Sequence, residues 1–279
     1  MEYSKKMPNT TEGWLQCAKE FEEHWNYPHC VAAMYGKHVM LQAPINSGSE
    51  YYNYKSYFSI VLFALVDANY NFIFADVGTQ GRISDGGIFK HSLIWKKIQE
   101  NSLSLPESKE LPGREKRIPY VILGDEAFAL HEHVMKPYSG LYEKGSKERI
   151  FNYRLSRARR VSENAFGILS AVFRVLRKPM LLEPNKARDV VLTTMYLHNY
   201  LRKSKNSRNT YTPAGTFDSE LNDGTVVAGS WRRDDVNQTS MCRLKKIPRK
   251  SPSNAQEIRE VFAEYFFTNG RIPWQNDSA

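Results

Sequence analysis

Hydrophobic residues recur along this chain at two spacings, one typical of helices and one typical of buried strands. Apolar residues three or four positions apart predict amphipathic helices over residues 11–26, 148–177, 186–202 and 255–267. Short, nearly continuous apolar runs predict strands over residues 31–43, 57–66, 72–77 and 120–123, and a further helix is expected over residues 85–99. This order of elements predicts an α/β fold in which helices cover a mixed sheet.

Polarity divides the chain into two parts. Residues 1–202 carry most of the predicted elements, together with a charged, proline-containing loop at 100–119 that is expected at the surface. Residues 203–253 are rich in Ser, Asn, Arg and Lys and are predicted to form a loop with little regular structure. We therefore expect a core over residues 1–202. Residues 203–279 are expected to form a polar linker and a C-terminal helix of the same domain.

Charge and cysteine content narrow the class of protein. The net charge is +9, from 39 Lys and Arg against 30 Asp and Glu, which favours polyanionic partners, although many basic proteins bind no nucleic acid. Three cysteines without CxxC spacing argue against a disulfide framework or a zinc site, and favour a reducing compartment. The longest apolar run, Ile60 to Val66, is far shorter than the roughly 20 residues that cross a bilayer, so no membrane partner is expected.

Three acids lie at positions where chemistry is expected. Asp125 directly follows a predicted buried strand, and carboxylates at such strand ends point into ligand-binding crevices. Asp85 lies in the turn SDGG before a helix, where the alternative is an ordinary stabilising role at the helix N-terminus. Glu163 lies within an arginine-rich helix, where the alternative is a surface ion pair with Arg159 or Arg160.

Gly167 lies one helical turn after Glu163. A glycine inside a helix costs roughly 1 kcal/mol relative to alanine, and the close approach of another chain or a ligand would explain it. Gly36 likewise marks a bend or a close approach in its strand.

The three acids, if they lie together, form a group of carboxylates that needs a cation to neutralise it. Mg²⁺ or Mn²⁺ suits such an all-oxygen cluster. Two such ions can activate a water and stabilise the leaving oxygen in phosphodiester cleavage. The arginines around Glu163 would then hold the DNA backbone; they are Arg149, Arg154, Arg157, Arg159, Arg160, Arg174 and Arg177.

Several segments, taken in order, resemble one known family. They are YGKHVML, GRISDGGIF, VILGDEAF and RLSRARRVSENAFGIL, followed by GSWRR and VFAEYFFTNGRIPWQ. Together they are similar to the DDE superfamily endonuclease domain of the PIF/Harbinger transposases and of the nucleases derived from them. The resemblance covers about residues 14–275 and implies an RNase H-like mixed sheet flanked by helices.

The resemblance also implies which residues are catalytic and hold a divalent metal. Asp85 matches the acid of the family's GxxxD turn, Asp125 the acid of its Gly-Asp strand end, and Glu163 the acid of its Glu-x-Ala-Phe-Gly helix. The first ligand is usually the Asp of an Asp-Gly-(Lys or Thr)-His motif, but here this position is Tyr35 in YGKH. A phenol ionises only near pH 10, so it is a poor anionic ligand and we expect an impaired site.

Two hypotheses follow from this substitution. The first is a Mg²⁺- or Mn²⁺-dependent DNA endonuclease or transposase core that uses the three carboxylates. The alternative is a domesticated, non-catalytic module that binds DNA or protein. The resemblance further implies a nuclear location, with the cytoplasm as a second compartment, and a Myb-like DNA-binding partner. Because no helical region precedes residue 14, we expect either a truncated chain or DNA targeting by that partner.

Other candidates carry weaker signals. His38, in GKHV, is typical of the family, but a packed strand histidine is an equal alternative. His131 and His133 have no evident third metal ligand, so we interpret them as surface or packing residues. Asp76 is interpreted as structural, at the end of a strand.

Overall fold

A mixed sheet forms the centre of the molecule. The computed structural model describes the chain apart from residues 1–6, 84, 222, 234–239, 245–250 and 279, and apart from the side chains of residues 85–87 and 277–278. Within the described residues the strand order is β3-β2-β1-β6-β7, and β10 is a further neighbour of β1. The strands are β1 (Cys30–Met40), β2 (Ser59–Val66), β3 (Phe72–Gln80), β6 (Val121–Leu123), β7 (Val134–Met135) and β10 (Met241–Arg243). β1, β2 and β3 are antiparallel neighbours, whereas β6 runs parallel to β1.

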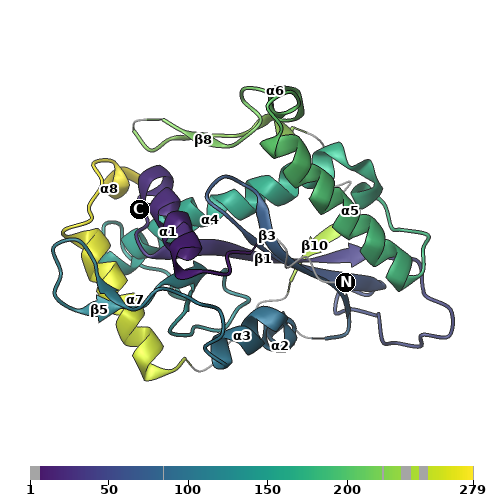
Figure 1. Ribbon diagram of the computed structural model, residues 1–279, viewed down its shortest axis with the longest axis horizontal. Coiled ribbons are helices and arrows are strands. Elements are labelled where there is room, and N and C mark those ends of the chain that lie inside the picture. The colour runs from purple at the N-terminus through teal and green to yellow at the C-terminus, as the bar shows by residue number, and fades with distance from the viewer. Residues whose placement is uncertain (1–6, 84, 222, 234–239, 245–250, 279) are drawn as a thin grey trace.

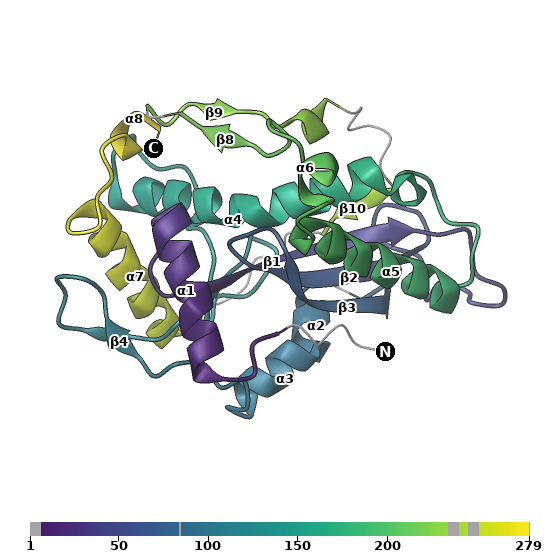
Figure 2. The same ribbon diagram turned by 45° about the horizontal axis from the view of Figure 1, so that its top comes forward.

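Helices cover both faces of this sheet (Figure 1 and Figure 2). The long helix α4 and helix α5 pack on one face, whereas α2 and α3 pack on the other. The helices are α1 (Thr11–Trp25), α2 (Asp85–His91), α3 (Leu93–Gln99), α4 (Lys147–Val172), α5 (Pro184–Lys203), α6 (Arg208–Tyr211), α7 (Ser253–Phe267) and α8 (Gln275–Ser278). The predicted α/β class, a mixed sheet flanked by helices, is confirmed.

Burial on both faces explains the unbroken apolar run of β2. Successive side chains of a strand point to opposite faces. Ile60, Leu62 and Ala64 join the core under α4, while Val61 and Phe63 join the core over α2 and α3. A strand buried on both sides therefore shows no alternation of apolar and polar residues.

The structure changes several predicted boundaries. The helix expected over residues 85–99 is broken into α2 and α3 at Ser92, whose hydroxyl caps α3 by accepting a hydrogen bond from the Trp95 N–H. The helix expected over 148–177 ends at Val172 and is followed by a 3₁₀ turn, η1 (Arg174–Arg177). The charged loop at 100–119 contains a short hairpin, β4 (Lys109–Glu110) and β5 (Arg117–Ile118).

Regular structure over residues 203–253 is limited to short elements in the described part of the segment, as predicted, but these elements pack on the core, which was not predicted. This segment contains α6, the hairpin of β8 (Ser219–Glu220) and β9 (Val226–Val227), the 3₁₀ turn η2 (Ser230–Arg232), and β10. The β8–β9 hairpin crosses above α4 (Figure 2), and β10 enters the central sheet. The segment gains this structure by packing on the core, which its polar composition does not reveal. None of the helices in the described parts of the chain is long and apolar enough to cross a membrane.

Candidate active site

The candidate site lies at a break along one edge of β1. β2 pairs along the other edge of β1, from Ala33 to Met40. On the site edge, β6 pairs up to Ala33, and β10 pairs antiparallel from Lys37 onward. The carboxyl ends of β6 and β10 therefore approach the same unpaired stretch, which contains Tyr35. A pocket of about 280 Å³ opens there.

This geometry brings together three of the four predicted positions. Ala33 pairs with Leu123, so Tyr35 and Asp125 each lie two residues beyond a matched pair of parallel strands. Helix α4 crosses this face of the sheet and adds Glu163. All three line the one pocket. Gly36 lies beside Tyr35, and a Cβ added to it would clash with the side chain of Leu244. The close approach predicted at Gly36 is therefore made by Leu244, the residue directly after β10.

Asp125 is held by a local turn. Its Oδ1 accepts a hydrogen bond from the Ala127 N–H at 2.9 Å, and the Phe128 N–H bonds to its carbonyl at 3.2 Å. Its Oδ2 has no hydrogen-bond partner among the residues that the structure describes. One carboxylate oxygen is therefore used by the fold, and the other is available to a ligand in the pocket.

Glu163 is neutralised by arginines. Its Oε1 accepts a hydrogen bond from Arg159 Nη2 at 2.7 Å, and its Oε2 lies 3.6 Å from Arg232 Nη2. Burial raises the pKa of Glu163, but the charges of Arg159, Arg243 and Arg232 and the Arg159 hydrogen bond outweigh it, so the net shift is downward. The sequence offered an ion pair with Arg159 as the alternative to a catalytic role for Glu163, and the structure contains this ion pair.

Tyr35 is a buried, neutral phenol. Only 4 % of its surface is exposed, and its ring packs edge-on against Phe166 with 5.1 Å between centroids. Burial, followed by the nearby charge of Glu163, raises the pKa of Tyr35 above its ordinary value of 10.0. At neutral pH the residue therefore offers a hydroxyl group and no negative charge.

The remaining sequence candidates contribute less. Asp85 is the first residue of α2, but its side chain is outside the described part of the structure, so its role as a metal ligand stays a prediction. His38 is buried and its Nδ1 lies 3.0 Å from the Ser59 hydroxyl, as expected for a packed strand histidine. His133 bonds to the Tyr120 carbonyl through Nδ1 at 2.9 Å. Asp76 lies within β3, opposite Phe63 of β2.

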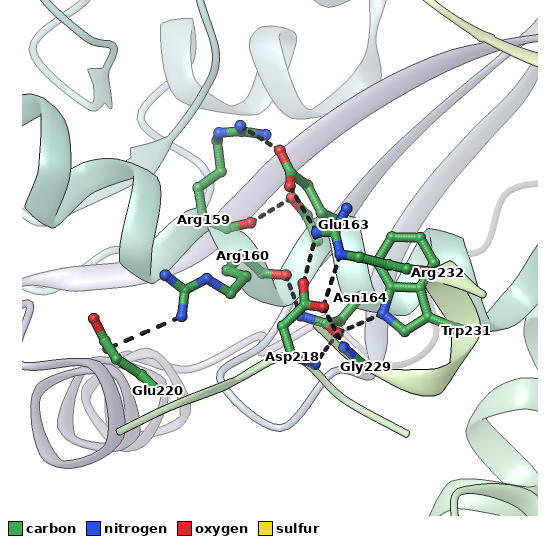
Figure 3. Close-up of polar contacts among 10 residues, drawn as sticks. Arg159, Arg160, Glu163, Asn164, Asp218, Glu220, Gly229, Trp231 and Arg232 are labelled. Carbon is green, nitrogen blue, oxygen red and sulfur yellow. Dashed lines mark hydrogen bonds and ion pairs between the residues drawn. The ribbon is translucent and has the colours of Figure 1, made fainter. Parts of the chain in front are cut away.

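A polar network that the sequence did not predict supports α4 beside Glu163 (Figure 3). Asn164 Oδ1 accepts hydrogen bonds from the Asp218 N–H and from Trp231 Nε1, both at 2.8 Å. The fully buried Asp218 carboxylate accepts two bonds from Arg232, at 2.8 and 2.6 Å, and one from the Gly229 N–H. The motif GSWRR, noted only as part of a resemblance, is thus the segment that packs against α4.

Gly167 makes this packing possible. A Cβ at this position would overlap the Trp231 indole ring, lying 2.5 Å from Cδ2 and closer to two other ring atoms. The predicted close approach is therefore that of another segment of the same chain.

Most arginines of α4 serve the fold. Arg154 is 1 % exposed and donates to the Gly270 carbonyl at 2.7 Å, and Arg157 donates to the Trp25 carbonyl at 2.6 Å and pairs with Glu220. Arg160 lies 3.9 Å from Glu220. The expectation that this set of arginines holds the DNA backbone is therefore wrong for Arg154 and Arg157, because their guanidinium groups are buried and already bonded.

The described side chains do not fit a two-metal site. Among them, no three His, Cys, Asp or Glu residues come together as a ligand set. Asp125 and Glu163 share the pocket, but Glu163 is paired with arginine and Tyr35 stays protonated. A pair of divalent ions needs several anionic oxygens around it. The two carboxylates and one phenol that the structure describes here do not supply them.

The fold and the order of its site residues define the class as an RNase H-like core of the DDE type. The chain belongs to the DDE superfamily endonuclease family, whose sequence model matches residues 34–199. It is similar to "Protein ALP1-like" of Arabidopsis thaliana, with 24 % identity over 185 residues that cover 65 % of this chain and 45 % of that protein. The chain thus spans about half the length of this curated relative. No solved structure matches. The family predicted from the ordered motifs is confirmed.

Proposed function

We propose that this chain is a transposase-derived DDE core that binds DNA and has lost most of its metal-dependent cutting activity. The observation that carries the proposal is Tyr35, a buried, protonated phenol at the position of the first metal ligand. The loss of one primary catalytic group commonly lowers rates by orders of magnitude. DNA is the expected ligand because the family consists of endonucleases and the net charge is +9.

The pairing of Glu163 supports the same proposal. Arg159 is hydrogen-bonded to the carboxylate oxygen that would otherwise be free to bind a cation. A guanidinium at hydrogen-bond distance stabilises the carboxylate charge and competes with a metal ion for it.

A specific observation favours the second candidate, a Mg²⁺- or Mn²⁺-dependent endonuclease. Asp125 and Glu163 remain in one pocket, and Asp125 Oδ2 has no partner among the described residues. With Asp85 as a third carboxylate they would hold a single ion, and the family's chemistry would use that ion for phosphodiester cleavage.

Nicking of supercoiled plasmid in Mg²⁺ or Mn²⁺ separates the two candidates. We expect no metal-dependent nicking by the wild type above the level of Glu163→Gln. We expect Tyr35→Asp to gain metal-dependent nicking, because it restores an anionic ligand beside Asp125. The double variant Tyr35→Asp/Glu163→Gln is the matched control and is expected to lose that gain. Thermal unfolding of each variant confirms that it is folded.

Two results would contradict the proposal. Nicking by the wild type that disappears in Glu163→Gln would establish the active nuclease. A folded Tyr35→Asp variant without nicking would show that Tyr35 does not explain the loss of cutting.

The compartment and the partner are proposals of the same kind. A DNA-binding core acts where DNA is, so we place the protein in the nucleus, where a Myb-like protein would supply sequence-specific binding. Imaging of the tagged chain with and without such a partner tests both points. Nuclear enrichment that does not need the partner would argue against targeting by that partner.

A further inference from the structure

Three cations from distant parts of the sequence meet beside the pocket. Lys37 lies on β1, and its direct partner in the adjacent strand is Arg243 of β10. The loop between β1 and β2 contributes Lys55. Tyr54, its neighbour, donates a hydrogen bond to the Arg243 carbonyl at 3.0 Å, and the charge of Lys55 acts on Lys37. Arg243 itself lines the pocket. We call Lys37, Lys55 and Arg243 the cation cluster.

Aromatic rings position both lysines. Lys37 Nζ lies 5.5 Å from the ring centroid of Tyr35, and Lys55 Nζ lies 5.8 Å from that of Tyr54. The negative face of an aromatic ring attracts a cation placed over it. The ring of Tyr35, which supplies no charge to a metal, therefore helps to hold a positive charge at the same place.

No carboxylate is in direct contact with the cation cluster among the described residues, although the charge of Glu163 acts on Lys37 and Arg243 from across the pocket. None of its three residues forms an ion pair with an acidic side chain in the described part of the chain. Of the two carboxylates in the pocket, Glu163 is paired with Arg159, whereas Asp125 accepts the Ala127 N–H through Oδ1 alone and keeps its charge. The charges also affect one another, since burial and then the charge of Arg243 lower the pKa of Lys37 to about 8.

Unpaired like charges held together cost electrostatic free energy, which a bound anion would recover. Most α4 arginines differ in this respect, because they are paired with carboxylates or backbone carbonyls. A side chain that is free, cationic and beside a nucleic-acid pocket is suited to contact phosphate oxygens.

We infer that the cation cluster binds a backbone phosphate of DNA directly, without a divalent ion. The inference rests on the proposed function, and it assigns the phosphate contacts to β1, β10 and the loop between β1 and β2 in place of helix α4. Lys55 and Arg243 are exposed and can reach a phosphodiester at the rim of the pocket.

Fluorescence anisotropy of a labelled DNA duplex in EDTA, at several NaCl concentrations, tests the inference. The variants are Lys55→Gln, Arg243→Gln and their combination, since both side chains are exposed and neither is bonded to a carboxylate among the described residues. The control is Lys109→Gln, an exposed lysine on the β4–β5 hairpin at the far end of the molecule from β10 (Figure 1). The same charge is removed in each single variant.

We expect the wild type to bind in EDTA. The slope of log affinity against log salt should fall by about 1 in each cluster variant and by about 2 in the double variant, with no change in Lys109→Gln. Unchanged slopes in the cluster variants, or binding only with Mg²⁺, would overturn the inference. Inorganic phosphate bound by the wild type, with DNA affinity unchanged in the double variant, would assign the cluster to free phosphate and would overturn it too. A wild type that binds no DNA under any condition would instead refute the proposed function.

Discussion

Replacing Gly167 by alanine tests the packing of the GSWRR segment on α4. In an unhindered helix this change stabilises by about 1 kcal/mol. Here the new Cβ overlaps the Trp231 ring, and overpacking of this kind costs about 1–3 kcal/mol. Displacing the ring also breaks the 2.8 Å bond from Trp231 Nε1 to Asn164, worth about 1 kcal/mol. The sum predicts that Gly167→Ala lowers the free energy of unfolding by about 1–3 kcal/mol.

Urea denaturation of a double-mutant cycle measures this effect. With Trp231→Ala as the background, the clash and the hydrogen bond are both absent, so Gly167→Ala should stabilise by about 1 kcal/mol. The coupling energy between the two positions is then about 2–4 kcal/mol, the difference between those two effects. If Gly167→Ala stabilises the wild type and the Trp231→Ala background equally, the indole ring does not restrict this position and the reasoning is refuted.

Two further predictions concern stability. Burial lowers the pKa of His198 from its ordinary 6.5 to about 4. Between pH 6.5 and 4, His198 is therefore protonated in the unfolded chain but neutral in the folded protein. The free energy of unfolding should fall by up to about 3 kcal/mol over this range. Denaturation at several pH values measures this, and an unchanged pH dependence in a folded His198→Gln variant would contradict it. Asp218→Ala should cost about 2–3 kcal/mol, because Arg232 and the Gly229 N–H lose their buried acceptor. Limited proteolysis between β8 and η2 should then precede global unfolding, and protection equal to the wild type would contradict this.

Elements with a local hydrophobic period could be predicted from the sequence. Helices α1, α4, α5 and α7 begin and end within a few residues of their expected positions, apart from the C-terminal end of α4. β10 could not be predicted, because its strand conformation comes from pairing with Lys37–Val39, far away in the sequence. The break between α2 and α3 at Ser92 was not predicted for a different reason. The apolar pattern continues across Ser92, while its hydroxyl caps the start of a new helix.

Two of the three predicted acids, Asp125 and Glu163, line one pocket in the structure, whereas the cations beside that pocket could not be predicted. Ordered motifs brought Tyr35, Asp125 and Glu163 together, and the structure places these three in one pocket. Arg243 and Lys55 lie in polar segments without a distinctive pattern, so only the folded chain reveals that they meet Lys37. Arginine richness on α4 was misleading, because composition does not separate a guanidinium bonded inside the fold from one facing solvent.

The shared edge of β1 has a consequence for how the protein is made. The edge of β1 that faces β10 stays unpaired at Lys37 until Arg243 has been synthesised, 206 positions later (243 − 37 = 206). At about 5–20 residues per second, a ribosome needs on the order of 10–40 s to supply that partner. During this time the emerging chain presents an unpaired strand edge next to apolar side chains, which is the kind of surface that invites aggregation. A lysine in the middle of such an edge disfavours pairing with a second nascent chain, so we expect Lys37 to lower the tendency of the emerging chain to aggregate.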